Sequence, residues 1–204
     1  MKKISIVLIL SLFGVLHAIS VAELHDRVKL SYQKLISFQA NVQQTNYYTQ
    51  LKRSIVYTGK LYFTPGRMLM SFYKPSVQRL QIQSGKAELY DASSNTLLRS
   101  KMQPEFGKMN PVEILQHYWT KSKVSIVKQE KHLCTVKLIP QKDPMIKEMQ
   151  AVIDSKTGIV NSLKYTDPAG NTVTYRFSNI KRDAAIPASV WKFNYPKDVQ
   201  VISQ

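Results

Sequence analysis

Apolar residues near the start of the chain recur at the spacing of one helical face. The stripe consists of Leu24, Val28, Tyr32 and Leu35, and polar residues fill most of the positions between them. This spacing is typical of an amphipathic helix that packs one side on a core. We therefore predict a helix over residues 23–37.

From residue 38 onward the pattern changes from the period of a helix to the period of a strand. Apolar and polar residues alternate over short segments, and turn-forming stretches such as SSN, DSKTG and DPAGN separate them. Repeated short strands of this kind are typical of an antiparallel meander. The expected strands cover residues 38–48, 54–63, 67–73, 77–83, 86–91, 96–101, 121–128, 132–139, 147–153, 159–166, 171–180, 190–195 and 199–202. Gly59 lies inside the second of them, where a glycine often marks a bend or bulge.

A second helix is expected in the middle of the meander. Asn110 is a favourable N-cap residue, Pro111 suits the first helical position, and Glu113 completes a capping pattern three residues after the cap. The apolar side of this helix would be formed by Ile114, Leu115 and Tyr118. The whole pattern predicts a mainly β, α+β fold: one curved antiparallel sheet of about ten strands with the helices packed on one side.

The first residues have the three parts of a secretory signal peptide. A basic start, MKK, precedes the apolar run ISIVLILSLFGVL, and SVA supplies the small residues of a cleavage site. We expect cleavage after Ala22, with Ala18 as the alternative site and an uncleaved anchor as the alternative interpretation. Residues 1–22 would then be removed, and residues 23–204 would form a single domain. No cysteine follows the apolar run, so the mature N-terminus would offer no thiol for lipid attachment.

The chain is strongly basic. It carries 29 Lys and Arg residues against 13 Asp and Glu, which gives a formal net charge of +16. Without Lys2 and Lys3, 27 basic residues remain against the same 13 acids. Such a charge favours approach to anionic membrane lipid, polyanionic saccharide or nucleic acid. No run of five basic residues occurs, so an ordinary solvated surface explains the charge equally well.

The sequence contains no pattern typical of an enzyme or a metal site. Outside the predicted signal peptide, His25, His117 and His132 are isolated from one another, and the only cysteine, Cys134, fits a buried position in a strand. No G-x-S-x-G and no phosphate-binding glycine loop is present. Aromatic residues interleaved with Lys and Arg could stack on bases, but no signature of single-strand binding accompanies them. We therefore expect no catalytic residues, no metal or other cofactor, and no nucleic-acid partner.

Several segments, in order along the chain, resemble the periplasmic outer-membrane lipoprotein carrier family, the soluble carriers of the lipoprotein localisation system. They are ISFQANVQQT after the first helix, then GKLYFTPGRMLMSFYKP, IQSGKAELYD and the C-terminal stretch DPAGNTVTYRFSNIKRDAAIPASVWKFNYPKDVQVI. Their order and spacing carry the resemblance, which covers nearly the whole mature chain. It implies a half-open, curved antiparallel β-barrel whose concave face is covered by helices that act as a lid.

The resemblance also implies a function without catalysis. Members of the family shield the acyl chains of triacylated lipoproteins in a hydrophobic cavity and carry them through the periplasm. Their partners are an inner-membrane lipoprotein-releasing transporter and an outer-membrane acceptor, which shares the fold but is itself a lipoprotein. The missing lipidation cysteine points to the soluble carrier. By this resemblance the protein would be a monomeric periplasmic chaperone of acylated lipoproteins.

The stretch at residues 62–75 would border the cavity of such a carrier, which would explain why it is apolar on both faces. One face of the strand 67–73 would line the cavity, and the other would rest against neighbouring structure. The expected cavity residues are Leu61, Phe63, Met68, Met70 and Phe72, with Val42, Tyr57, Leu80 and Ile82 as weaker candidates, and the lid would contribute Ile114, Leu115 and Tyr118. For each of them an ordinary place in the core is the alternative.

Two positions depart from the family pattern. Many members have an arginine directly before the first proline of the second segment, where it tethers the lid, whereas this chain has Thr64 before Pro65. Arg67 could act as the tether instead. A turn that usually contains an aspartate is shortened here to Ser84-Gly85. Two alternatives therefore stay open: a carrier of another acylated lipid or glycolipid on the same fold, and a small secreted hydrolase.

Overall fold

The computed structural model describes residues 19–101 and 111–203. The expected signal peptide up to residue 18 and the expected cap Asn110 lie outside these residues. The described elements are α1 (Val21–Gln33), β1 (Phe38–Tyr48), β2 (Arg53–Thr64), β3 (Arg67–Lys74), β4 (Gln78–Gln83), β5 (Lys86–Asp91), β6 (Thr96–Lys101), α2 (Pro111–Thr120), β7 (Ser122–Glu130), β8 (Leu133–Pro140), β9 (Glu148–Asp154), β10 (Val160–Thr166), β11 (Thr172–Arg182), a 3-10 turn η1 (Ala188–Trp191) and β12 (Gln200–Ser203).

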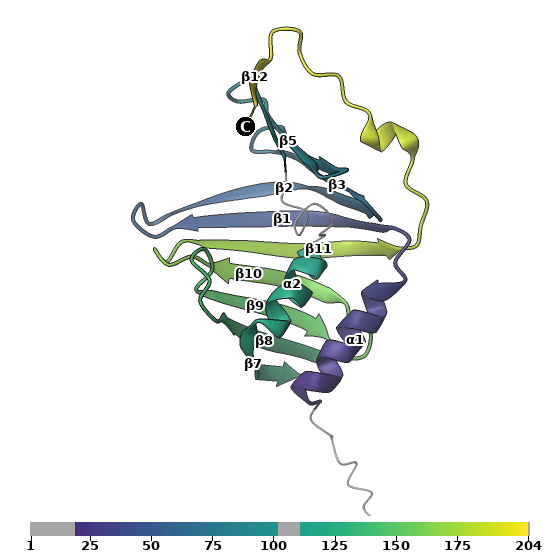
Figure 1. Ribbon diagram of the computed structural model, residues 1–204, viewed down its shortest axis with the longest axis vertical. Helices are drawn as coiled ribbons and strands as arrows, with labels where there is room; N and C mark the ends of the chain where they lie inside the picture. Colours follow the sequence, from purple (N-terminus) through teal and green to yellow (C-terminus); the bar gives the residue numbers. More distant parts are fainter. Residues whose placement is uncertain (1–18, 102–110, 204) are drawn as a thin grey trace, which may run out of the picture.

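All of these strands belong to one sheet, in the order β12-β6-β5-β4-β3-β2-β1-β11-β10-β9-β8-β7. Neighbouring strands are antiparallel, except that β12 runs parallel to β6. Figure 1 shows α1 and α2 together on one face, in front of the half that contains β7–β11, while β3–β6 and β12 bend away from the helices. The predicted fold class is confirmed, with twelve described strands rather than about ten.

The C-terminal segment differs from its prediction. A strand was expected at residues 190–195, but this segment forms the end of η1 and an extended connection without sheet pairing. Its aromatic side chains pack on the sheet instead: the Trp191 ring lies 6.5 Å from Tyr62 and the Phe193 ring 5.4 Å from Tyr90. In this segment the alternation of aromatic residues therefore reflects packing on the face of the sheet and not pairing with an edge strand.

Helix α1 begins two residues earlier and ends four residues earlier than predicted. Ser20 caps it: the Ser20 hydroxyl accepts from the Glu23 N–H, and the Glu23 carboxylate accepts from the Ser20 N–H. Past the helix end, the Ile36 N–H donates to Asp183 Oδ1 at 2.8 Å, which directs the chain into β1. The predicted stripe is buried at Leu24, Val28, Tyr32 and Leu35. Neither described helix has the length and hydrophobicity needed to cross a lipid bilayer.

Strand β3 is buried on both faces over most of its length, and only Tyr73 and Lys74 at its end are exposed. Met68, Met70 and Phe72 belong to the main core beneath the helices, at 5–7% exposure. Leu69 points to the opposite face and is fully buried there. That face is covered by the C-terminal segment, which Arg79 anchors by donating to the Val190 carbonyl at 3.0 Å. The sheet therefore separates a large core from a smaller one.

Gly59 allows strands β2 and β3 to approach closely where the sheet bends. The pairing register shifts between Thr58 and Gly59, as expected for a bulge. A Cβ atom on Gly59 would lie 2.3 Å from the Ser71 carbonyl oxygen and 2.7 Å from the Phe72 Cα. Only glycine fits this position without moving the β3 backbone.

Candidate functional site

A cavity of about 620 Å³ lies between helix α2 and the concave face of the sheet. Its lining comes from β1, β3, β4, β9, β10, β11, α2 and the β8–β9 and β10–β11 connections. Fifteen of the nineteen lining residues are apolar or aromatic, and Asp167 is the one charged residue among them. An apolar cavity with few polar groups suits an apolar ligand.

Strands from both halves of the sheet form two opposite walls. On one wall, Met70 of β3 pairs with Leu80 of β4, and Met68 pairs with Ile82. The other wall is built by the same alternation on β9, β10 and β11: its residues are Met149, Leu163, Tyr165, Val173 and Tyr175. The walls face each other because the sheet curves through β2 and β1, which lie between them in strand order.

Helix α2 covers the cavity and is joined to the β8–β9 connection by one side-chain hydrogen bond. The Tyr118 hydroxyl donates to Asp143 Oδ2 at 2.8 Å. Asp143 Oδ1 accepts from the backbone N–H groups of Met145 at 2.7 Å and Ile146 at 2.8 Å, which shapes the connection that lines the cavity. Burial and the bond to Asp143 raise the pKa of Tyr118 to about 12. Burial opposes ionisation of Asp143, but the bonds from Tyr118 and the two backbone groups outweigh it and lower the pKa of that carboxyl.

The polar residues of the lining are concentrated at the end of the cavity near the β1–β2 and β10–β11 connections. Asn46 accepts a bond from Gln44 at 2.9 Å. Asp167 accepts from both the backbone N–H and the side-chain amide of Asn171 at 2.8 Å. Because these groups form hydrogen bonds with neighbouring polar groups, they can border an apolar space at little cost in free energy.

Two tyrosines bring hydroxyl groups deeper into the cavity. The rings of Tyr165 and Tyr175 lie 6.4 Å apart on neighbouring strands. Burial raises the pKa of both hydroxyls, so that they stay protonated at neutral pH. The inner part of the cavity therefore carries no charge from these groups.

The structure brings half of the residues predicted for the cavity and lid into one lining. These six are Met68, Met70, Leu80, Ile82, Ile114 and Tyr118. The other six lie outside the lining: Leu61, Phe63, Phe72, Val42 and Leu115 are buried in the main core, and Tyr57 packs against that core. The five that lie on strands belong to the inner face of the sheet, as their alternation indicated, but neighbouring side chains fill the space above them.

Arg67 does not lie where a tether of the lid would be needed. Its guanidinium stacks 4.3 Å from the centre of the Trp191 ring, which assigns it to the C-terminal segment on the outer face of the sheet. Helix α1 is instead joined to the sheet and its turns by two other arginines. Arg182 of β11 donates to the Ser31 carbonyl, and Arg27 donates to the Ser155 carbonyl at 2.5 Å.

Sequence reasoning missed the half of the lining that comes from the second part of the chain. These residues are Met145, Ile146, Met149, Leu163, Tyr165, Val173 and Tyr175, together with Tyr47 and Tyr48 at the end of β1. Strand alternation places Leu163 with Tyr165 and Val173 with Tyr175 on common faces. Alternation alone does not predict that β9–β11 lie opposite β3 and β4, because that arrangement depends on the curvature of the sheet and on the order in which the strands pair.

Within residues 19–101 and 111–203, no group of three or more His, Cys, Asp or Glu side chains is arranged to hold a metal ion. The free cysteine, Cys134, is fully buried. The cavity lining offers mainly apolar contact, with amide and carboxylate groups at one end and tyrosine hydroxyls deeper inside.

Comparison with known proteins points to one family. Residues 33–194 match the family described as outer membrane lipoprotein carrier protein LolA. The chain is 27% identical over 144 residues to the outer-membrane lipoprotein carrier protein of Ralstonia nicotianae, a match that covers 69% of this chain and 66% of that protein, just under two thirds.

Solved structures with the same fold are more distant in sequence. An uncharacterized conserved protein from Thermus thermophilus aligns with a TM-score of 0.57 and 16% identity, over 90% of this chain and 98% of that one. MucB, in complex with MucA(peri), aligns with a TM-score of 0.53 and 11% identity, over 90% of this chain and 62% of that one. At such identities the likeness concerns the fold alone.

Proposed function

This chain belongs to the outer membrane lipoprotein carrier protein LolA family, and we propose that it binds acyl chains of lipoproteins in its cavity and carries them through the periplasm. The cargo would be received at the inner membrane from a lipoprotein-releasing transporter and delivered to an acceptor at the outer membrane. No covalent bond would be made or broken. The protein would reach the periplasm by means of a cleaved signal peptide.

The apolar cavity beneath α2 is the observation that supports this proposal most directly. Burial of one methylene contributes about 0.8 kcal/mol, so a chain of about sixteen carbons represents roughly 10 kcal/mol or more. Four methionines, Met68, Met70, Met145 and Met149, belong to the lining. Their unbranched side chains can adapt to acyl chains of different shape. Such a surface suits a carrier that must accept and release many cargoes.

The volume of the cavity limits how much acyl chain it holds when α2 is in place. A methylene has roughly the volume of a water molecule, about 30 Å³, so a sixteen-carbon chain needs about 480 Å³. The cavity of about 620 Å³ therefore has room for about one such chain. A triacylated cargo would require either movement of α2 or a second apolar surface.

The sheet offers a second apolar surface beside the cavity. A row of paired residues runs from Met70 through Leu80, Leu89 and Leu98 to Ile202, across five neighbouring strands. Met70 is 7% exposed, Leu80 and Leu98 are half-buried, Leu89 is 39% exposed, and Ile202 at the far end is 49% exposed. We infer that further acyl chains lie along this row where it leaves the cavity.

The limited cavity volume also favours one alternative, a carrier of free lipids with fewer chains. The two functions differ in what the protein retains when it is purified from the periplasm without detergent. Mass spectrometry of the bound material is expected to find triacylated protein. Free phospholipid or glycolipid would support the alternative, and release of fatty acid from an added ester would support a hydrolase.

A binding experiment tests the proposal independently of purification. A triacylated lipopeptide is expected to displace a fluorescent fatty acid from the wild-type protein, whereas the same peptide without acyl chains is not. Failure of the acylated peptide to bind, with the protein folded and free of other lipid, would refute the carrier function.

A further inference from the structure

Three connections meet at the polar end of the cavity and form one rim. They are the β1–β2 connection at residues 49–52, the β8–β9 connection at residues 141–147 and the β10–β11 connection at residues 167–171. Thr49 joins two of them: its hydroxyl donates to the Gly170 carbonyl at 2.6 Å, and its N–H donates to Asn171 Oδ1 at 3.0 Å. Residues of the β8–β9 connection line the same cavity as Asn171. The rim is therefore a connected surface around the cavity end.

The rim presents apolar side chains to solvent. Leu51 and Met145 are each 72% exposed, and they are the two most exposed large apolar residues of the described chain. Tyr47 and Tyr48, which also line the cavity, are 37% and 36% exposed. Exposed apolar groups gathered at one site indicate a surface that contacts a partner or a membrane.

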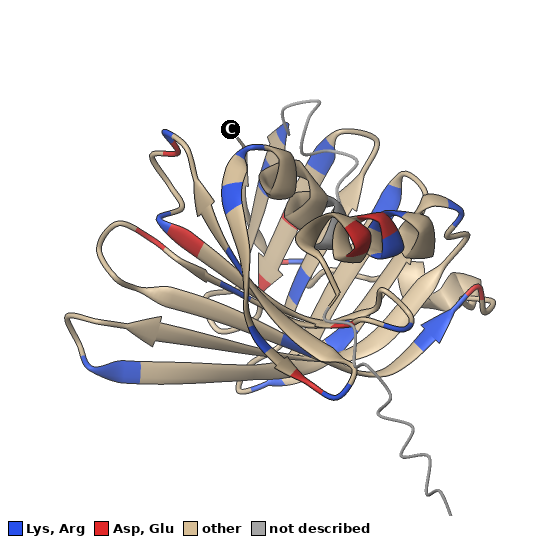
Figure 2. Cartoon of the chain, turned by 90° about the horizontal axis from the view of Figure 1, so that it is seen from below, with Lys and Arg blue, Asp and Glu red and all other residues tan. Residues whose placement is uncertain are grey.

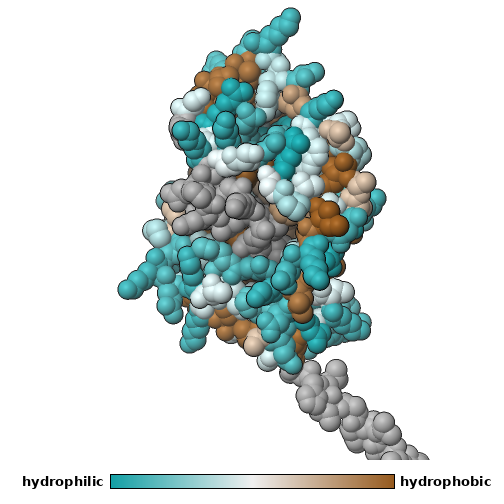
Figure 3. Space-filling view, turned by 45° about the vertical axis from the view of Figure 1, so that its right-hand side comes forward, coloured by the Kyte–Doolittle hydropathy of each residue, from teal (hydrophilic) through white to brown (hydrophobic). Residues whose placement is uncertain are grey.

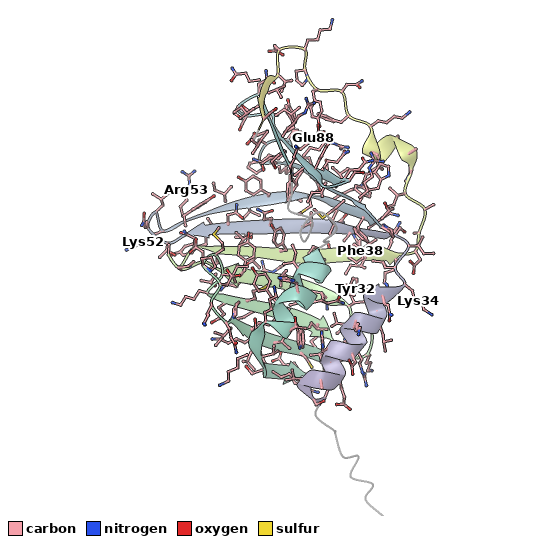
Figure 4. All side chains as sticks on the ribbon, in the orientation of Figure 1. Tyr32, Lys34, Phe38, Lys52, Arg53 and Glu88 are labelled. Carbon is pink, nitrogen blue, oxygen red and sulfur yellow. The ribbon has the colours of Figure 1, made fainter. Side chains whose placement is uncertain are left out.

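Cations accompany these apolar groups. Lys52 and Arg53 follow Leu51 directly, and Lys142 and Lys147 flank Met145. All four are exposed. Figure 4 shows Lys52 and Arg53 projecting at the tip of the β1–β2 connection, and Figure 2 shows basic residues at the tips on this side. The acids of the rim are Asp143 and Asp167, and both are engaged by the hydrogen bonds described above. The rim therefore combines apolar tips with an excess of positive charge.

We propose that this rim docks the protein on the surface of an anionic phospholipid bilayer. Leu51 and Met145 would enter the boundary between headgroups and acyl chains, Tyr47 and Tyr48 would lie at headgroup level, and the four cations would contact lipid phosphates. The cavity would then open toward the bilayer, so that an acyl chain passes between membrane and protein with little contact with water. The role in transfer rests on the proposed carrier function, whereas docking can be measured without cargo.

The composition of the rim favours a membrane over a protein partner. A bilayer presents negatively charged headgroups above an apolar layer. The rim presents exposed apolar side chains with cations beside them, so that the apolar side chains can reach the acyl layer while the cations contact the headgroups. Figure 3, which brings the other end of the molecule forward, shows hydrophobic residues there as separate patches among hydrophilic ones. That end supplies a matched control on α1: Leu30 is 70% exposed, and Lys34 is exposed near it, at the end of the sheet opposite Lys52 and Arg53 (Figure 4).

The test measures co-sedimentation of the cargo-free protein with vesicles at low salt. Binding is expected to vesicles that contain phosphatidylglycerol with phosphatidylcholine, and to be at least tenfold weaker to phosphatidylcholine alone. Each cation removed should weaken binding about fivefold, so K52Q/R53Q should lose about twenty-five-fold. L51S, which removes an exposed apolar side chain outside the cavity lining, should also weaken vesicle binding, and this loss should persist at high salt, where the cations are screened. The control variant L30S/K34Q, which removes one charge, should change the affinity for vesicles by less than about twofold.

Any of the following results would contradict the proposal. Equal binding to both vesicle types would remove the role of lipid charge. An equal loss in L30S/K34Q would show that the overall charge of +16, rather than the rim, attracts the protein. Normal vesicle binding by both rim variants, with loss of transfer from a protein partner, would assign the rim to that partner. All variants change exposed residues. Retained binding of a soluble fatty acid would show that their fold and cavity are intact. A loss of docking can then be distinguished from a loss of the carrier function.

Discussion

Replacement of Tyr118 by phenylalanine tests whether one hydrogen bond holds the lid helix over the cavity. The substitution removes the hydroxyl that donates to Asp143 Oδ2 at 2.8 Å and keeps the buried ring. A hydrogen bond to a charged acceptor contributes about 1.5–3 kcal/mol, and Asp143 keeps its two backbone donors, so we expect a loss near the lower end, about 1.5 kcal/mol. If opening of α2 breaks only this bond, the open fraction should rise about tenfold.

The pH dependence of this loss gives a second, independent readout. The pKa of Asp143 is lowered on folding, since the hydrogen bonds it accepts outweigh its burial. A carboxyl with a depressed pKa contributes stability above its unfolded pKa of 3.8, and this contribution is lost as the pH falls through the folded value. The difference between wild type and Tyr118→Phe should therefore be full at neutral pH and shrink at pH values below 3.8.

The assay combines urea denaturation with the dissociation rate of a fluorescent fatty acid. Tyr57→Phe is the control, because it removes a hydroxyl from a ring that packs 5.7 Å from Phe72 without taking a bond from Asp143. Tyr118→Phe should unfold at lower urea and release the probe faster, and Tyr57→Phe should do neither. A Tyr118→Phe protein with unchanged stability and release would show that α2 is held by packing alone.

Three further outcomes are expected. Met70→Glu should leave the protein folded, because this core residue also borders the cavity, but should weaken acyl binding more than tenfold in a titration with a fluorescent fatty acid; unfolding instead would show that an apolar side chain at Met70 is required for the fold. Gly59→Ala should lower the free energy of unfolding by about 2–4 kcal/mol, because its Cβ would meet the Ser71 carbonyl at 2.3 Å; a loss near zero in urea denaturation would mean that β3 moves freely. The Ser20 cap of α1, worth about 1 kcal/mol, favours the alternative cleavage site after Ala18 over the site expected from the sequence after Ala22, because cleavage there would remove the cap; N-terminal sequencing of the exported protein should therefore find Ala18, and cleavage after Ala22 would show that the cap does not decide the site.

The periodicity of the sequence was sufficient for most of the elements. The stripe from Leu24 to Tyr32 identified α1, and short apolar segments separated by turn residues identified β1 through β11 within a few residues at each end. The segment at residues 190–195 could not be assigned from its pattern, since alternating aromatic residues serve a strand at a sheet edge and a segment lying on a sheet face equally well. Only the way in which the chain crosses the sheet distinguishes the two.

The cavity could be predicted only in part, for a different reason. Alternation tells which face of β3 and β4 points inward, and so Met70 and Ile82 were found. It does not tell which inward residues are covered: Leu61 and Met70 are paired across β2 and β3, yet only Met70 reaches the cavity. That difference depends on how neighbouring side chains fill the core.

The most direct test of the central claim is the affinity of the protein for single acyl chains of increasing length, measured below the concentration at which they form micelles. Each added methylene should tighten binding about fourfold until the chain has about sixteen to twenty carbons, where a cavity of about 620 Å³ is full and the increase should level off. Affinity that does not depend on chain length would contradict the account, because it would show that the cavity does not bury the acyl chain.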